Sequence, residues 1–145
     1  IPSVLIQLLK GAKEIKLGNL SPKRDLTYIE DTTNAFLSIL SCKKNIIGEV
    51  INIGSGYEIS INEIINILKK DFGFKFDVIT DKKRIRPSKS EVMRLLAKNT
   101  KAKNILNWKP SYNSLKGFKI SLEKTIKWFQ KEENLNSYKY DKYNI

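Results

Sequence analysis

Apolar residues recur three and four positions apart in several separate stretches of the chain. This spacing is typical of helices with one buried face, and it predicts helices at residues 2–10, 31–40, 60–68, 99–106 and 114–129. Asp31 is predicted to cap the second of these helices, and Ser60 with Glu63 has the form of a capping box. The last helix is expected to turn one apolar stripe inward: Leu115, Phe118, Leu122, Ile126 and Phe129.

Alternating or β-branched stretches lie between these helices and predict strands. They occupy residues 14–17, 25–29, 49–53 and 74–80. The third of these is expected to be a buried strand that closes in the turn Gly54-Ser55-Gly56. A polar loop is expected over residues 81–90, and a frayed polar tail over residues 131–145. Strands that alternate with helices predict an α/β architecture.

The composition is that of a folded protein. With 145 residues, of which 41% are hydrophobic and 29% charged, the chain is long enough for one domain, and no run approaches the ~20 apolar residues that cross a bilayer. Cys42 is the single cysteine and histidine is absent, which excludes an internal disulfide, a Cys/His metal site and a His-dependent catalytic triad. Because the chain opens on Ile1 without a signal segment, we expect it to be the C-terminal piece of a longer protein.

The net charge of +12 is weak evidence for a nucleic-acid partner. Lysine, isoleucine and asparagine, the residues of AT-rich codons, make up 56 of the 145 positions, so much of the basicity reflects a lysine background. Against that background only four arginines remain: Arg24, Arg84, Arg86 and Arg94. A planar guanidinium grips a phosphate or carboxylate through two parallel N–H bonds, which an ammonium cannot do. The arginines are therefore the first candidates for a binding site.

The turn Gly54-Ser55-Gly56 has two interpretations. It follows a predicted strand and precedes a helix, as a dinucleotide-binding loop does, but the third glycine of G-x-G-x-x-G would fall at Ile59. A turn that only reverses the chain needs no ligand, and we favour this interpretation.

Two Tyr-x-x-x-Lys spacings also occur, Tyr112 with Lys116 and Tyr138 with Lys142. At this spacing a lysine can lower the pKa of a catalytic tyrosine. With six tyrosines and 23 lysines in the chain, such pairs are expected by chance. Neither pair has the buried mid-helix setting that the chemistry needs, so we interpret both as accidental.

Two arginine-bearing segments point to a diphosphate. Arg24 lies at the edge of a short extended segment, and Arg84-Ile85-Arg86-Pro87 lies in the predicted loop, where the proline stiffens the chain. Two arginines from separate loops that converge on one point suit a pyrophosphate, and each charge-assisted hydrogen bond contributes roughly 1.5–3 kcal/mol. If Arg24 instead makes only a surface ion pair with nearby acids, it contributes ~0–1 kcal/mol.

These segments occur in an order that resembles a known family. The matching stretches are Arg24 to Thr32, Val50 to Gly56, Arg86 to Val92, and Asn99 to Lys103 followed by Trp108-Lys109-Pro110. Together they resemble the C-terminal half of the NAD-dependent epimerase/dehydratase family, the extended short-chain dehydrogenase/reductases that act on nucleotide sugars. The closest resemblance is to the UDP-N-acetylglucosamine 4,6-dehydratases of legionaminic-acid-type pathways, through the Arg-x-Arg-Pro-x-Lys-Ser-Glu-Val stretch.

The resemblance implies a division of roles among the candidate residues. Arg24 and Arg86 would contact the diphosphate of a UDP-sugar, and Glu91 would meet the ribose. The strand Ile15-Lys16-Leu17 would present backbone groups and one apolar face to the base. No catalytic residue and no metal ligand is expected within the chain.

The family's glycine-rich NAD loop and its catalytic Tyr-x-x-x-Lys lie upstream of the region that matches. The resemblance therefore implies that residues 1–130 are the nucleotide-sugar-binding portion, with the last Rossmann elements and a small α/β substrate-binding lobe, and that an N-terminal NAD-binding domain lies outside this chain. The intact enzyme would oxidise C4 of the sugar with bound NAD, eliminate water across C5–C6 and return the hydride to C6. The chain alone is expected to be catalytically inert.

The same resemblance implies a homodimeric, cytoplasmic parent enzyme of surface-polysaccharide synthesis, with a UDP-sugar substrate and no nucleic-acid or membrane partner. A piece cut from a larger core is expected to leave apolar faces exposed and to be poorly soluble alone. Three alternatives stay open: a nucleotide-sugar 4-epimerase of the same family, a small basic nucleic-acid-binding module, and a truncated copy that serves only as a partner surface.

Overall fold

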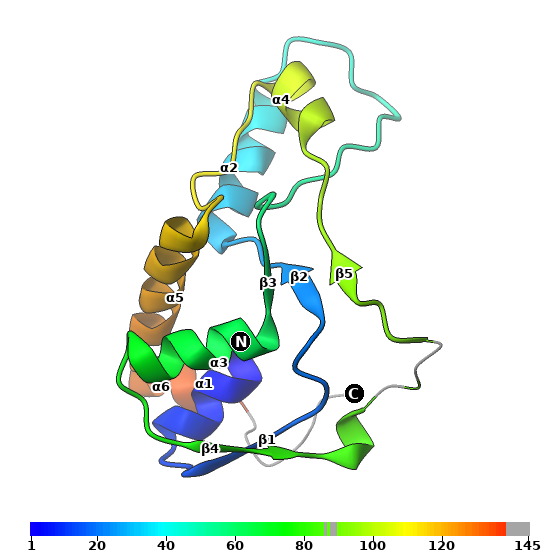
Figure 1. Cartoon of the computed structure of the whole chain (residues 1–145). Helices are drawn as coiled ribbons and strands as arrows, with labels where there is room; N and C mark the ends of the chain where they lie inside the picture. The colour runs from blue at the N-terminus through cyan, green and yellow to red at the C-terminus, as the bar shows by residue number, and fades with distance from the viewer. Residues whose placement is uncertain (86, 88–89, 139–145) are drawn as a thin grey trace. The chain divides into compact units, whose positions relative to one another are not determined.

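Short strands and helices alternate along the chain and give the α/β architecture that the sequence predicts (Figure 1). The structure is a computed structural model, and it describes residues 1–85, 87 and 90–138. The chain divides into two compact units. Unit 1 comprises Ile1–Ser21, Ile61–Glu91 and Leu122–Ile145, and unit 2 comprises Pro22–Ser60 and Val92–Ser121.

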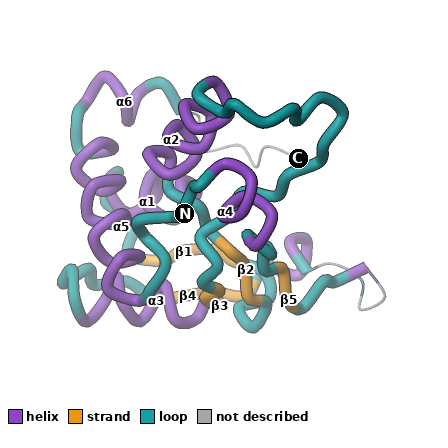
Figure 2. The backbone as a smooth tube through the Cα atoms, turned by 90° about the horizontal axis from the view of Figure 1, so that it is seen from above, coloured by secondary structure: helices purple, strands orange, loops and turns teal. Residues whose placement is uncertain are grey.

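Unit 1 is built on a pair of parallel strands. Strand β1 (Glu14–Leu17) pairs with β4 (Asp77–Thr80) in the register Glu14↔Asp77 to Leu17↔Thr80 (Figure 2). Helices α1 (Pro2–Leu9) and α3 (Ile61–Lys70) belong to the same unit. The core takes one face of each element, and its least exposed side chains are Leu5, Ile15, Leu68 and Leu122. Burial of each such side chain contributes roughly 1.5–3 kcal/mol.

Helix α5 (Leu115–Phe129) carries the predicted inward stripe with one exception. Phe118, Leu122, Ile126 and Phe129 are buried, whereas Leu115 in the first turn is 46% exposed. The chain beyond α5 departs from the predicted frayed tail, because α6 (Glu132–Asn136) forms there. An amide N–H of Asn134 donates to the carbonyl of Trp128 at 2.8 Å, and Tyr138 packs edge-on against the rings of Trp128 and Phe129. These contacts order a segment that has no apolar periodicity of its own.

Unit 2 contains a three-stranded sheet with β2 (Lys23–Asp25) in its centre. Strand β3 (Glu58–Ser60) pairs with β2 antiparallel, and β5 (Arg94–Leu95) pairs with it parallel. Glu58 and Arg94 form an ion pair between the two outer strands, with 2.7 Å between nitrogen and oxygen. The hydrogen bond and the charge of Glu58 raise the pKa of Arg94.

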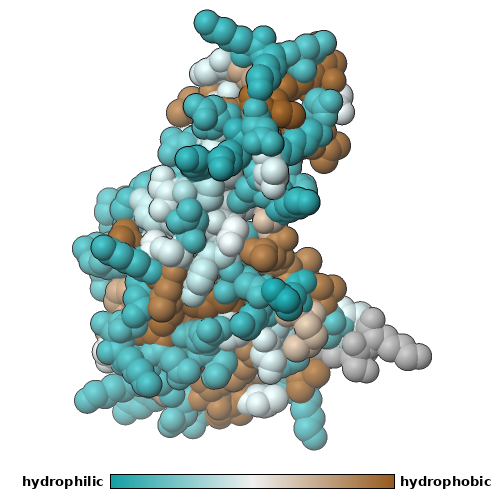
Figure 3. Space-filling view, turned by 45° about the horizontal axis from the view of Figure 1, so that its top comes forward, coloured by the Kyte–Doolittle hydropathy of each residue, from teal (hydrophilic) through white to brown (hydrophobic). Residues whose placement is uncertain are grey.

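A small apolar core lies beside this sheet in unit 2. Helix α2 (Ile29–Leu40) contributes Ala35, and α4 (Thr100–Leu106) contributes Ala102 and Leu106, which pack with Trp108. The side of α2 turned away from this core remains exposed, as does the segment after it. The large exposed apolar residues there are Ile29, Phe36, Leu37, Leu40, Ile47 and Val50. Figure 3 shows hydrophobic residues, in brown, at the surface of the molecule.

The predicted buried strand over residues 49–53 is wrong. No strand forms between α2 and β3, and Val50 is 79% exposed. A β-branched segment becomes a strand only where a neighbouring strand takes up its backbone hydrogen bonds. Among the described residues no strand pairs with this segment.

The predictions around β2 were displaced by a few residues. The strand covers Lys23–Asp25 instead of residues 25–29, and α2 begins at Ile29 with Tyr28 as its N-cap. Asp31 does not cap the helix, because its carboxylate accepts hydrogen bonds from the backbone N–H groups of Ser111 and Tyr112. Three further differences are the shorter β4 and the short strands β3 and β5, which the sequence did not indicate. No helix among the described residues is long and apolar enough to span a membrane.

Candidate functional site

Arg24 occupies the centre of the sheet in unit 2. It pairs with Ile59 of β3 on one side and with Leu95 of β5 on the other. Its guanidinium is half-buried, and Nη1 donates to the carbonyl of Lys23 at 2.8 Å. Strand β2 thus has a paired neighbour on each side of Arg24.

The carboxylate of Asp25, the next residue along β2, joins three segments of unit 2. It accepts hydrogen bonds from the backbone N–H of Ser55 at 2.7 Å, from the Ser55 hydroxyl at 2.6 Å and from the N–H of Gly56 at 2.9 Å. The N–H of Ala97, two residues after β5, donates to it at 3.2 Å. Both neighbours of β2 are thus tied to one side chain.

This arrangement decides the role of the turn Gly54-Ser55-Gly56. A dinucleotide-binding loop needs free backbone N–H groups for a pyrophosphate. Two of these N–H groups instead donate to Asp25. A Cβ on Gly54 would lie 2.3 Å from the Cβ of Ala97 and 2.8 Å from Oδ2 of Asp25, so the glycine is there for close packing. The turn is structural, as favoured from the sequence.

Strand β1 and the loop after β4 form a second group of candidate residues, in unit 1. The N–H of Asp81 donates to the carbonyl of Leu17 at 2.8 Å, which holds the loop against the end of β1. A Cβ on Gly18 would lie 2.3 Å from the carbonyl oxygen of Arg84, so this close approach requires glycine.

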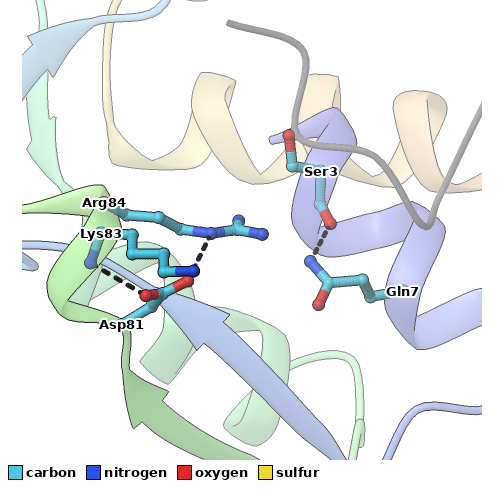
Figure 4. A network of polar contacts seen from close by, with 5 residues as sticks. All are labelled: Ser3, Gln7, Asp81, Lys83 and Arg84. Atoms are coloured by element: carbon cyan, nitrogen blue, oxygen red, sulfur yellow. Dashed lines mark hydrogen bonds and ion pairs between the residues drawn. The ribbon is translucent and has the colours of Figure 1, made fainter.

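Asp81 organises that loop, which contains the short 3₁₀ helix η1 (Lys82–Arg84). Its carboxylate accepts a hydrogen bond from the N–H of Lys83 at 3.0 Å and pairs with Nε of Arg84 at 3.2 Å (Figure 4). The Arg84 and Asp81 side chains are only 21% and 24% exposed. The loop that leads to Arg86 therefore starts from a well-anchored base.

Comparison with family models gives the match that decides the class of the protein. Residues 1–120 match the model described as GDP-mannose 4,6 dehydratase. The chain belongs to this family. The relatives found by sequence include epimerases and 4,6-dehydratases of nucleotide sugars, which confirms the NAD-dependent epimerase/dehydratase family expected from the sequence motifs.

Two of the curated relatives are an epimerase and a dehydratase. The UDP-glucuronate 4-epimerase of Thermodesulfobacterium geofontis is 34% identical over 85% of this chain and 35% of its own length. The human dTDP-D-glucose 4,6-dehydratase is 30% identical over 96% of this chain and 38% of its own length. The chain thus spans little more than a third of the length of these relatives.

Solved structures agree with this assignment. The UDP-glucuronic acid 4-epimerase from Bacillus cereus, in complex with UDP-glucuronic acid and NAD, is 32% identical with a TM-score of 0.68, over 86% of this chain and 38% of that chain. The epimerase Mth375 from Methanothermobacter thermautotrophicus has a TM-score of 0.75 over 94% of this chain and 39% of that chain, at 24% identity, and supports the fold alone. The fold of this family member is that of part of an extended short-chain dehydrogenase/reductase, as predicted.

Within this family member, the candidate residues fall on different parts of the structure. Ile15, Lys16 and Leu17 lie together in β1 of unit 1, and Glu91, partly exposed, lies at the end of a later segment of that unit. Arg24 lies in unit 2. Arg86, the other predicted diphosphate ligand, lies outside the described residues.

The structure leaves fewer groups of β1 available to a nucleotide base than the resemblance implied. The Ile15 side chain is 0% exposed and belongs to the core, so it cannot supply the apolar face expected there. Strand alternation turns Lys16 to the other side, and Leu17 is partly buried. In the described part of the chain, β1 pairs with β4 alone, so the strand's other edge is the part that can offer backbone groups.

The first Tyr-x-x-x-Lys spacing, Tyr112 with Lys116, has no catalytic setting in the described structure. The Tyr112 hydroxyl donates to a carboxylate oxygen of Glu30 at 2.6 Å, and its ring packs edge-on against Tyr28. Tyr112 thus fastens the start of α2 to the chain before α5. The second spacing ends at Lys142, outside the described residues.

The sequence did not single out Asp25, and it predicted Asp31 only as a helix cap and Asn99 only as a helix start, although the structure gives each a central position. Asp31 is 1% exposed, and Asn99 donates to the carbonyl of Gly54 at 2.7 Å. The available signal was weak: a single polar residue inside an otherwise extended or apolar stretch. Only the fold shows which distant backbone groups these side chains reach.

Proposed function

We propose that residues 1–130 are the nucleotide-sugar-binding portion of an NAD-dependent sugar-nucleotide 4,6-dehydratase with a UDP-N-acetylglucosamine-like substrate. Arg24 and Arg86 grip the diphosphate of that substrate. The observation that carries the proposal is the placement of Arg24, a half-buried guanidinium on the central strand of unit 2, in a family whose B. cereus epimerase was solved with UDP-glucuronic acid. A fixed guanidinium favours a bidentate contact with phosphate oxygens.

The nucleoside end of the substrate is assigned to unit 1. The free edge of β1, from Ile15 to Leu17, binds the base through backbone groups, and Glu91 accepts a ribose hydroxyl. The anchored loop of Asp81 and Arg84 beside Gly18 supports this assignment, because it holds the strand end in one conformation. Rigid backbone groups recognise a base at low entropic cost.

The nicotinamide cofactor belongs, in this proposal, to a domain outside residues 1–145. The glycine-rich turn within the chain does not fit a dinucleotide, because Asp25 takes up its N–H groups. The exposed apolar side of α2 supports a neighbouring domain, since Leu40 is 82% and Phe36 62% exposed. Residues 1–145 alone then bind substrate without turning it over.

The proposal also places the enzyme in its cellular setting. We assign it to the cytoplasm, to surface-polysaccharide synthesis and to a homodimeric state, with no nucleic-acid or membrane partner. These assignments rest on the family resemblance of the Arg-Asp-x-x-Tyr and Arg-Pro segments.

A 4-epimerase of the same family is the second candidate. The observation in its favour is the 34% identity with a UDP-glucuronate 4-epimerase, compared with 30% for the human dehydratase. Both functions need the same grip on the nucleotide diphosphate and differ in what happens at the sugar.

The test uses the complete enzyme, that is, this chain together with its cofactor domain, and UDP-N-acetylglucosamine deuterated at C4. A dehydratase releases a product that has lost water and carries the deuterium at C6. An epimerase gives a product of unchanged mass with deuterium still at C4. Neither product, with a UDP-sugar bound, would overturn the substrate assignment, and no binding of any UDP-sugar would overturn the proposed function.

A further inference from the structure

Asp25 follows Arg24, the proposed diphosphate-binding residue, in β2. Its side chain accepts several hydrogen bonds from other segments of unit 2. Its carboxylate accepts from Ser55 twice, from Gly56 and from Ala97. These donors lie on both sides of β2, ahead of β3 and after β5. One side chain thus ties the central strand to both of its neighbours.

The strands that hold Arg24 are too short to fix it by pairing alone. Strand β2 pairs with β3 over Lys23 to Asp25 and with β5 only at Lys23 and Arg24. Ladders of this length are marginal by themselves. The carboxylate of Asp25 adds charge-assisted hydrogen bonds just where both ladders end, and such bonds are short and directional.

Packing around Asp25 points to the same role. A Cβ on Gly54 would lie 2.8 Å from Oδ2 of Asp25, so the turn approaches the carboxylate as closely as glycine allows. The turn itself is buried at Ser55 and at Gly54. The carboxylate is therefore locked in place by the backbone around it.

Consecutive side chains of a strand point to opposite faces of the sheet. Asp25 and Arg24 therefore leave β2 in opposite directions, and Asp25 cannot touch the ligand that Arg24 would bind. It can act only through the backbone that the two residues share.

We infer that Asp25 is the positioning residue for Arg24: it sets the strand from which the guanidinium reaches the substrate diphosphate. This inference rests on the proposed function, because it assumes that Arg24 binds the diphosphate. The turn Gly54-Ser55-Gly56 then supports the phosphate site indirectly, because its donors bind the Asp25 carboxylate.

The test compares binding of UDP and of uridine to the complete enzyme, because only UDP carries the diphosphate. Asp25→Asn is expected to weaken UDP binding by about tenfold, roughly the value of one charge-assisted hydrogen bond, and to leave uridine binding unchanged. Ser55→Ala removes one of the donors and is expected to give a smaller loss of the same kind. Calorimetry at a temperature where each variant is folded measures both affinities.

Asp31→Asn is the matched control. Asp31 is also a carboxylate of unit 2 that accepts two backbone N–H bonds, but it lies in α2, away from Arg24 in the sequence. It is expected to lower the stability without a loss specific to UDP. Equal losses for UDP and uridine in Asp25→Asn, or the same pattern in Asp31→Asn, would show a merely structural role and overturn the inference.

Arg24→Lys separates the inference from the proposed function. If Arg24→Lys weakens UDP binding and Asp25→Asn and Ser55→Ala do not, the inference fails while the diphosphate assignment stands. If Arg24→Lys leaves UDP binding unchanged, the diphosphate assignment itself fails.

Discussion

At the scale of single residues, two carboxylates and two glycines organise the backbone of the two units. Asp25 and Asp31 each collect backbone N–H groups from segments far away in the sequence. Gly18 and Gly54 allow backbone approaches that any Cβ would block. These residues hold distant segments of the backbone together.

Arg86→Lys in the complete enzyme is expected to weaken UDP-sugar binding about tenfold or more, because the proposed site needs a planar guanidinium for two parallel hydrogen bonds and an ammonium cannot make them. Lys89→Arg changes the same loop and is the control, for which little effect is expected. Titration calorimetry with the UDP-sugar measures both affinities. Equal, small effects at the two positions would remove Arg86 from the diphosphate site.

Gly18→Ala is expected to cost about 1–3 kcal/mol of unfolding free energy, because the new methyl group collides with the carbonyl of Arg84 at the end of β1. The loop has to move, so the affinity for uridine is expected to fall as well. Asn19→Ala, at the next and exposed position, serves as the control. Urea unfolding and uridine titration check the prediction, which fails if the two variants behave alike.

At the scale of elements, helix α2 has two unlike faces. Asp31 and Ala35 face the interior of unit 2, while Ile29, Phe36 and Leu40 lie on the exposed side. A helix exposes such a stripe at a cost unless another surface covers it. In the proposed function that surface belongs to the cofactor domain.

Leu40→Glu is expected to leave the fold of unit 2 intact, because Leu40 is 82% exposed. It is expected to weaken the association with the cofactor domain, since a charge would enter an apolar contact. The complete enzyme is then expected to melt at a lower temperature. Binding of the cofactor is also expected to have less effect on the affinity for the substrate. Asn34→Glu, on the same helix outside the stripe, is the control. Equal melting temperatures for the two variants would contradict the role of this face.

Most helix positions along the chain followed from the periodicity, whereas among the predicted strands only residues 14–17 form a strand, β1, with the predicted bounds. Residues 61–70 and 115–129 form helices close to the predicted bounds, because a helix satisfies its own backbone hydrogen bonds. Residues 49–53 have the β-branched composition of a strand and form none, because a strand needs a partner that the composition does not reveal. Strand β5 was not predicted, because a strand of two residues is too short to show an alternation of apolar and polar side chains.

At the scale of the whole molecule, the chain is expected to be a substrate-binding portion and not an independent enzyme. It spans 35–38% of the length of the two curated relatives described above and carries an exposed apolar face on α2. The net charge of +12 opposes self-association only in part, because lysines are spread over the whole chain.

Residues 1–145 expressed alone are expected to be poorly soluble and to turn over no UDP-sugar, and co-expression with a cofactor domain of the family is expected to restore solubility. Size-exclusion chromatography and thermal melting measure the first point, and product analysis measures the second. A monomeric product that melts cooperatively would contradict the prediction.

The sequence by itself indicated the family through the resemblance of its ordered motifs, most of the helices through local periodicity, and the candidate arginines through a residue type that only certain chemistries require. Only the tertiary structure decided that Asp25 fills the Gly-Ser-Gly turn, that Asp31 bonds to residues 111 and 112, and that the Ile15 side chain belongs to the core. Each of these depends on contacts between segments 30 or more residues apart, or on which side of a strand is covered. Such contacts leave no periodic signal in the sequence. Many small or acidic residues could make them, and only the folded structure shows which residues do.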